Sequence, residues 1–112
     1  MAWQRTPTDD EPRELLARDR PWFQGWEIRP GISVPGPNDI AAIMDRAGVS
    51  HDLSGKRVLD IGAYNGCVSL ECERRGASEV VWQNGTIYQL DPAIHGTFDV
   101  VICFGVLYTL RW

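Results

Sequence analysis

Three residues in the middle of the chain have the types and the spacing to bind a small ligand. Asp60, Gly62 and Gly66 form the pattern D-x-G-x-x-x-G, directly after an apolar run. Glycine lets the backbone turn tightly and approach a ligand closely, and a helix that begins behind such a turn presents N–H groups to a polar or anionic group. Because ligands of open α/β sheets lie at the carboxyl ends of strands, the pattern predicts a binding loop.

This loop favours one class of ligand over another. A dinucleotide-binding loop has the pattern G-x-G-x-x-G, which places a pyrophosphate on the helix, whereas the residue two places after Gly62 is Tyr64. The carboxylate of Asp60 would repel a pyrophosphate but accept hydrogen bonds from an ammonium group, directly or through water. S-adenosylmethionine has an ammonium group and a cationic sulfonium, so the loop favours this cofactor over NAD. The residues alone also allow an ordinary strand-turn-helix in which Asp60 caps the helix.

The other chemically reactive residues form no recognisable site. The three cysteines, an odd number, are Cys67, Cys72 and Cys103, without a C-x-x-C pair. His51 and His95 lie far apart in polar segments, and with the cysteines they have no metal-ligand spacing. We therefore assign no metal and no nucleophile, interpret the cysteines as small buried hydrophobes, and expect a reduced, cytoplasmic setting.

Short apolar runs that alternate with helical patterns predict the elements around the loop. The expected strands are residues 57–61, 79–82 and 98–104, with 86–90 as a further candidate. A helix is expected over residues 68–75, closed by Gly76, and another from Gly105 onward. This alternation predicts an α/β fold with a parallel sheet.

The first 37 residues differ in character from the rest. They contain six of the seven prolines and three of the five tryptophans, and proline excludes a long helix or a central strand there. A short helix is expected up to Arg18, because Thr8 can cap it and Glu11 stands at capping-box spacing. Residues 21–37 are then expected to form an extended arm with turns.

A second helix is expected to begin the remainder of the chain. Asn38 can cap it, the apolar residues within 40–47 fall at helical spacing, and Gly48 is a natural stop. We therefore divide the chain into an N-terminal helix and arm, residues 1–37, and a ligand-binding domain, residues 38–112.

Four segments carry motifs that are specific in combination: residues 53–66 (LSGKRVLDIGAYNG), 71–81 (ECERRGASEVV), 98–108 (FDVVICFGVLY) and 21–36. The first looks like the first motif of class I S-adenosylmethionine-dependent methyltransferases. The second is similar to the helix and second strand of one subgroup, which includes the tRNA wobble-uridine methyltransferases and carboxymethyltransferases. The third resembles the fourth-strand motif of that subgroup, and the last its segment before the core. The resemblance implies an incomplete Rossmann-like sheet of roughly three to four strands, preceded by the helix and the arm.

The resemblance also implies roles for individual residues. Asp60 and Gly62 would contact the methionine part of the cofactor, in a binding loop that includes Ala63 and Gly66. The remaining implied residues are Ile87 and Tyr88 near the adenine, Phe104 and Tyr108 beside the transferring group, and Trp22 where the pocket closes. Trp22, Ile87 and Phe104 are equally compatible with plain core positions, and Tyr108 with the surface of a helix.

The chain departs from this family in several places. No acid stands at the end of the second strand, where relatives bind the ribose, since residues 82–84 are Trp, Gln and Asn. Only three residues separate Trp82 from Thr86, whereas neighbouring parallel strands need a crossover of about a dozen. The pair Asn84-Gly85 predicts a two-residue hairpin turn, with one irregular strand or a loop as the alternatives.

The second departure is the end of the chain, at Trp112. The family fold needs about 150 residues to finish its sheet, so we interpret the 112 residues as the cofactor-loop half of such a domain. The last strand would then lie at an exposed edge that invites self-association or a partner. Gln24 stands where carboxymethyl-transferring relatives use lysine, which favours ordinary S-adenosylmethionine over a carboxylated form.

The expected function is therefore methyl transfer from S-adenosylmethionine to an acceptor that the sequence does not identify, either tRNA or a small molecule. Catalysis in such relatives is mainly alignment of the acceptor with the methyl group, so no catalytic residue is assigned. A net charge of −4 argues against broad nucleic-acid binding, and no apolar run reaches the roughly 18 residues of a membrane span. The alternative is an inactive relative that acts as a binding or partner-dependent module.

Overall fold

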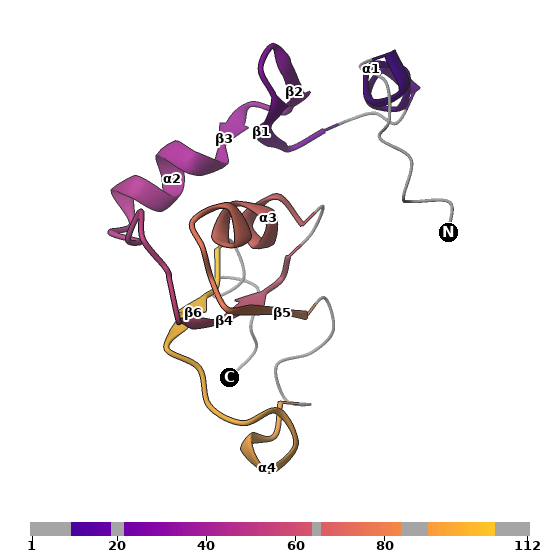
Figure 1. Ribbon diagram of the computed structural model, residues 1–112. Coiled ribbons are helices and arrows are strands. Elements are labelled where there is room, and N and C mark those ends of the chain that lie inside the picture. Colours follow the sequence, from indigo (N-terminus) through magenta and orange to yellow (C-terminus); the bar gives the residue numbers. More distant parts are fainter. Residues whose placement is uncertain (1–9, 19–21, 64–65, 84–89, 105–112) are drawn as a thin grey trace. The chain divides into compact units, whose positions relative to one another are not determined.

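Short helices and strands follow one another along the chain in the computed structural model, which describes residues 10–18, 22–63, 66–83 and 90–104 (Figure 1). The strands form two three-stranded sheets, so the predicted mixed α/β class is confirmed. The chain divides into two units, residues 1–43 and 44–112. This division falls inside the second helix rather than before it. The expected turn at Asn84-Gly85, the candidate strand 86–90 and the helix from Gly105 lie outside the described residues.

The first unit contains a helix and a small sheet. Helix α1 (Asp10–Arg18) has acidic residues in its first turn and a basic residue in its last, which suits the helix dipole. The expected cap of this helix, Thr8, lies outside the described residues. The sheet has the order β2-β1-β3, and its strands are β1 (Gln24–Arg29), β2 (Ile32–Pro35) and β3 (Asn38–Asp39).

The expected extended arm is an antiparallel hairpin. Strands β1 and β2 pair from Gly25 opposite Pro35 to Arg29 opposite Ile32. The two residues between them are Pro30 and Gly31, and Gly31 has a φ of 77°, the combination that favours a type II turn at its two central positions. Proline and glycine thus place the turn, while Pro35 stands at the end of β2.

The predicted cap of helix α2 (Ile40–Arg46) is wrong by one residue. Asp39, not Asn38, caps the helix, because its Oδ1 accepts the N–H of Ala42 at 3.1 Å. Asn38 belongs to β3 and is held against β1, where its backbone N–H and its Nδ2 both donate to the carbonyl of Phe23, at 3.2 and 2.8 Å. The strand pairing therefore moves the start of the helix. Gly48, with a φ of 80°, follows the helix end as predicted.

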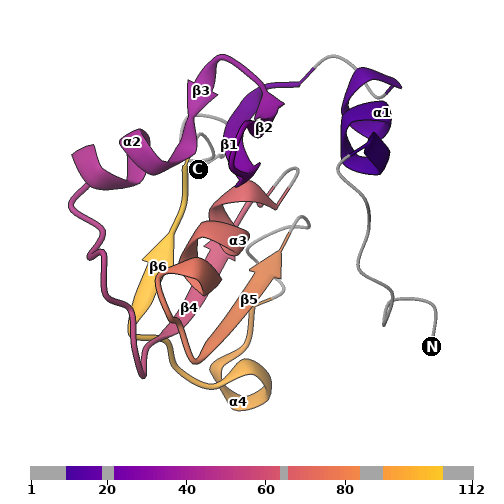
Figure 2. The ribbon, with the colours of Figure 1, turned by 45° about the horizontal axis from the view of Figure 1, so that its top comes forward.

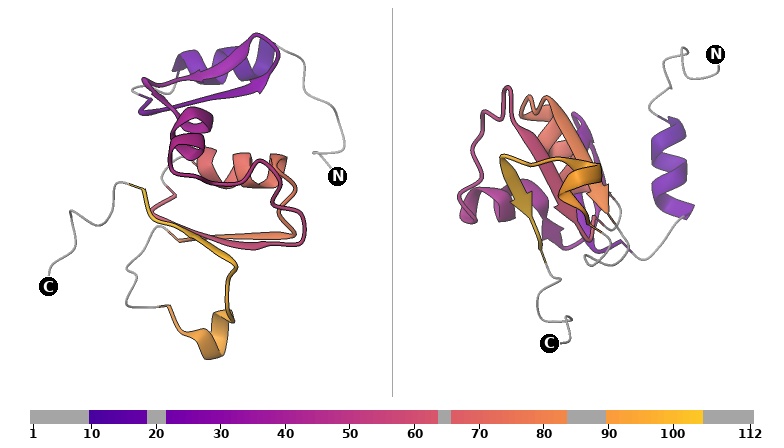
Figure 3. Two further views of the ribbon diagram at one scale, coloured as in Figure 1. Left: turned by 90° about the vertical axis from the view of Figure 1, so that its left-hand side faces the viewer. Right: turned by 90° about the horizontal axis from the view of Figure 1, so that it is seen from below.

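The second unit has a parallel sheet in the order β5-β4-β6. Strand β4 (Arg57–Ile61) lies in the centre and pairs in parallel with β5 (Glu79–Gln83) on one side and β6 (Val100–Ile102) on the other (Figure 2). Helix α3 (Cys67–Arg74) covers one face of this sheet, and the short helix α4 (Pro92–His95) lies beyond the opposite face (Figure 3).

Strand β6 is shorter than the predicted strand over residues 98–104. The residues before β6 are held by Arg57 at the start of β4 instead of pairing as a strand. The guanidinium of Arg57 stacks on the ring of Phe98 at 4.6 Å and donates to the carbonyls of Thr97 and His95. The backbone N–H of Arg57 also donates to Asp99 Oδ2 at 2.9 Å. Arg57 therefore fixes where the last strand enters the sheet.

The core of the second unit combines apolar side chains with a buried ion cluster. Among its fully buried side chains are Met44, Leu53, Val58 and Cys72. No helix within the described ranges has both the length and the apolar character that crossing a bilayer requires.

The buried ion cluster is centred on Arg75, whose side chain is only 4% exposed. Its guanidinium donates to Asp45 Oδ1 at 2.8 Å and to Glu71 Oε1 at 3.3 Å. It also donates to the backbone carbonyls of Val49 and Ser50, at 3.0 and 3.3 Å. One side chain thus joins the end of α2, the segment that follows α2, and α3. The charge pattern along the chain does not predict this cluster.

Replacement of Arg75 by alanine is expected to lower the free energy of unfolding by about 3–5 kcal/mol, because a buried carboxylate and two carbonyls lose their shared partner. The adjacent Arg74 is the matched control. Its side chain is 45% exposed and lies 3.7 Å from Glu71, so Arg74→Ala is expected to cost less than about 1 kcal/mol. Urea denaturation of both variants checks this, and equal losses would contradict the structural role of Arg75.

Candidate functional site

The parallel sheet has a switch point at the end of β4. The chain leaves β4 and returns to form β5 on one side, then crosses to form β6 on the other. The carboxyl ends of the three strands lie at the same edge, because all three are parallel. In open sheets of this kind, the connections that leave neighbouring strands in opposite directions open a crevice at that edge, where ligands bind. The glycine loop begins at this point.

The described part of the glycine loop is a tight turn into α3. Gly62 has a φ of 71° and Gly66 one of 83°, conformations that other residues rarely adopt. The N–H of Gly66 donates to the carbonyl of Ala63 at 2.9 Å, and the side chain of Ala63 is buried. Gly66 stands at the N-cap position of α3 and offers no side-chain cap. Both glycines therefore serve the turn that their spacing predicted.

Asp60 ties the central strand to the start of the helix. Its side chain is on the α3 face of the sheet and is 2% exposed. Its Oδ2 accepts the hydroxyl hydrogen of Ser69, in the first turn of α3, at 2.7 Å. Burial raises the pKa of Asp60 above its usual value, and the hydrogen bonds from Ser69 oppose that rise. Asp60 thus supports the start of α3, which is the structural role that the residue pattern alone also allows.

A residue that the sequence pattern did not single out stands beside Asp60. Trp82 of β5 is the register partner of Asp60 in β4, so the two side chains are on the same face of the sheet. Trp82 is 60% exposed. Trp82 is placed beside Asp60 by the parallel pairing of β4 with β5. Its apolar type and its place at a strand end were the only signals in the sequence.

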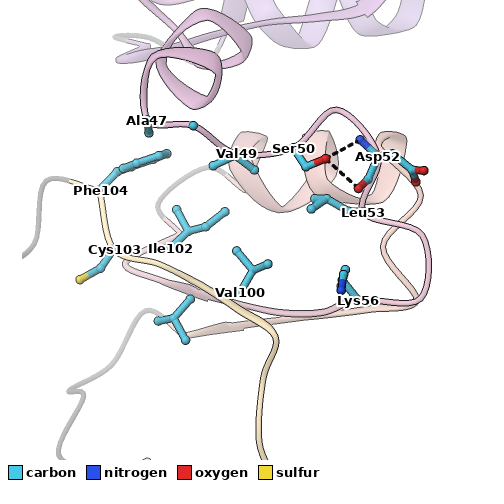
Figure 4. A pocket seen from close by; sticks show the side chains of 12 residues that line it. Ala47, Val49, Ser50, Asp52, Leu53, Lys56, Val100, Ile102, Cys103 and Phe104 are labelled. Carbon is cyan, nitrogen blue, oxygen red and sulfur yellow. Dashed lines mark hydrogen bonds between the residues drawn. The ribbon is translucent and has the colours of Figure 1, made fainter.

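Phe104 lines a groove of about 520 Å³ beside β6 (Figure 4). Val49, Leu53 and Ile102 contribute apolar side chains to this groove. Its polar lining residues include Ser50, Asp52 and Lys56. Figure 4 shows the ring of Phe104 toward Ala47 at one end of the groove, with the sulfur of Cys103 pointing away from it. Phe104 therefore lies on an apolar surface next to the last strand.

Four predicted binding residues remain, and the structure describes only one of them. Ile87, Tyr88 and Tyr108 lie outside the described residues. Trp22 belongs to the first unit, where its indole Nε1 donates to the carbonyl of Leu16 at 2.9 Å. The structure thus groups Asp60, Gly62, Ala63 and Gly66, and adds Trp82 to them.

All three cysteines are free. Cys67 and Cys72 are buried, as expected, while Cys103 is half-buried. Burial raises the pKa of Cys67, and burial together with the nearby charge of Asp60 raises that of Cys72 to about 11. Across the described ranges, no group of three or more His, Cys, Asp or Glu side chains is placed to hold a metal ion.

Comparisons with known proteins identify no relative of this chain. No family model, no curated protein and no solved structure matches it.

The raised pKa of Asp60 predicts a pH-dependent difference between the wild type and Asp60→Asn. Asparagine can still accept the hydrogen bond from Ser69 but has no charge to desolvate. A carboxyl group whose pKa is raised by folding stabilises the protein below its unfolded value of 3.8, and this contribution is lost as pH rises through the folded value.

The Asp60→Asn variant should therefore gain stability relative to the wild type as pH rises from about 4 to about 7. Urea denaturation across that range measures the difference. A difference that is constant, or that shrinks with rising pH, would contradict a raised pKa.

Proposed function

We propose that this chain is a class I methyltransferase-type protein that binds S-adenosylmethionine at the carboxyl edge of its parallel sheet. The observation that carries the proposal is the position of the glycine loop. It leaves the central strand of the order β5-β4-β6, at the switch point where open sheets bind ligands. We propose in the same way that the parallel sheet is part of a Rossmann-like methyltransferase sheet.

The chemistry of the loop supports a zwitterionic ligand. The start of α3 carries the positive end of the helix dipole, which suits the carboxylate of an amino acid. The carboxylate of Asp60 lies beneath the same loop and is tied to the first turn of α3, so its negative charge suits an ammonium and a sulfonium group. A pyrophosphate would meet the same negative charge at close range, which argues against a dinucleotide.

The reaction itself places few demands on the side chains. When bound, S-adenosylmethionine supplies an activated methyl group. The chain has to hold the cofactor and align an acceptor in line with the sulfonium. Asp60, Gly62, Ala63 and Gly66 are the proposed binding residues, and Phe104 is proposed to border the acceptor side. We propose a cytoplasmic setting and, as acceptor, either tRNA or a small molecule.

Binding of S-adenosylhomocysteine, the demethylated form of the cofactor, tests this proposal. Isothermal titration calorimetry should show saturable binding of S-adenosylhomocysteine to the wild type. It should show no binding of NAD. The Asp60→Asn variant is expected to bind about ten- to a hundredfold more weakly, because hydrogen bonds to charged groups contribute about 1.5–3 kcal/mol.

The matched control is Asp91→Asn, at the N-cap of α4. Asp91 Oδ1 accepts the N–H of Ala93 at 2.8 Å, a role that asparagine fills equally well. This variant should bind like the wild type. A folded wild type that binds neither S-adenosylmethionine nor S-adenosylhomocysteine would refute the proposal.

A second candidate function is that of a partner-dependent module without activity. The observation in its favour is β6, which pairs only with β4 among the described strands. Val101, in the middle of β6, is 57% exposed. A strand with an open apolar edge is a template for pairing with another chain.

Size-exclusion chromatography with light scattering separates the two functions. The second function predicts self-association that Val101→Lys weakens at least several-fold, because a charge on an edge strand opposes pairing. A monomer that binds S-adenosylhomocysteine would exclude it.

A further inference from the structure

We propose that Trp82 is the surface on which the nucleoside part of the cofactor stacks. This inference rests on the proposed function, because it assigns a second contact to the same ligand. It adds a residue that neither the acid-and-glycine pattern nor the family resemblance includes among the binders.

The exposure of Trp82 is the first observation. Tryptophan is among the most buried side chains on average, yet Trp82 is 60% exposed while its neighbours in the register, Asp60 and Ile102, are 2% and 3% exposed. An indole ring left in water at a strand end costs the favourable free energy of its burial. A flat ligand that covers the ring recovers it.

The position of Trp82 is the second observation. It stands directly opposite Asp60, on the neighbouring strand, and adjacent strands lie about 4.8 Å apart. Both side chains are on the α3 face, and both precede the last residue of their strand. A ligand whose amino-acid end lies at the glycine loop above Asp60 therefore reaches the indole of Trp82 as it extends across the end of β5.

The chemistry of the indole ring is the third observation. Stacking of a nucleobase on an aromatic side chain contributes about 1–3 kcal/mol and requires no particular pattern of hydrogen bonds. The indole face of Trp82 can therefore contact the nucleoside by stacking, which requires only a flat partner.

The experiment uses two ligands and measures the dissociation constant of each by calorimetry with the full chain. 5′-Methylthioadenosine has the nucleoside but neither the ammonium nor the carboxylate, whereas S-adenosylhomocysteine has all three. Trp82→Ala should weaken the binding of both ligands by about tenfold, a factor that corresponds to 1.4 kcal/mol. Trp82→Phe should retain binding within about threefold, because phenylalanine keeps a stacking face.

Two variants provide the controls. Asp60→Asn should weaken S-adenosylhomocysteine binding but leave 5′-methylthioadenosine binding unchanged. Val101→Ala removes an apolar side chain that is 57% exposed on the opposite face of the sheet, and should change neither. Circular dichroism of each variant establishes that it is folded.

The outcomes are distinct. Equal weakening of both ligands by Trp82→Ala, with rescue by Trp82→Phe, supports the inference. If Trp82→Ala binds both ligands as the wild type does, the inference fails while the proposed function stands. Weakening of S-adenosylhomocysteine alone also overturns it, because the ring would then contact the amino-acid end. Absence of wild-type binding to S-adenosylhomocysteine refutes the proposed function itself.

Discussion

The second unit depends on the pairing of β4 from both sides. Because β4 is central and parallel to both neighbours, its carboxyl end lies between those of β5 and β6, and there the chain turns over the sheet to begin α3. Gly62 makes this turn possible and Asp60 fastens it, through the hydrogen bond to Ser69. The candidate binding loop is therefore a consequence of the strand order. The buried carboxylate holds it in place.

The sequence predicted the elements around β4 well because their signals are local. The strand 57–61 is reproduced residue for residue, and the helix and strand that follow differ from prediction by one residue at their ends. An apolar run that ends in glycine, and a helical pattern closed by Gly76, need no tertiary information. The turn at Gly62 and Gly66 is also predicted from their spacing, and the structure adds that both have a positive φ.

Long-range contacts account for what the sequence did not predict. Asn38 was expected to cap α2, but pairing with β1 recruits it and leaves the cap to Asp39. The stacking and hydrogen bonds of Arg57 shorten the last strand. Arg75 was indistinguishable from Arg74 in the sequence, yet only Arg75 is buried among carbonyls and carboxylates. Each of these outcomes depends on a partner that is distant along the chain: Gln24 for Asn38, His95 for Arg57 and Asp45 for Arg75.

The two parts of the candidate site differ in the same way. The pattern around Asp60 is readable from the sequence, whereas Trp82 joins it only through the register of β4 and β5. Asp60 has a structural role that is visible in its contact with Ser69, and the proposal assigns it an electrostatic one as well. A buried carboxylate whose pKa is raised by desolvation does not favour folding at neutral pH. Its presence is easier to understand if a cationic ligand uses the charge.

The most direct test of this account is a nuclear magnetic resonance titration of the isotope-labelled chain with S-adenosylhomocysteine. We expect the amide signals of Gly62, Ala63 and Gly66 and the indole signal of Trp82 to shift together, with one saturation curve, while the signal of Gly31 in the hairpin turn stays in place. Saturable shifts that leave the glycine loop unchanged, or no shifts at all in the folded protein, would contradict it.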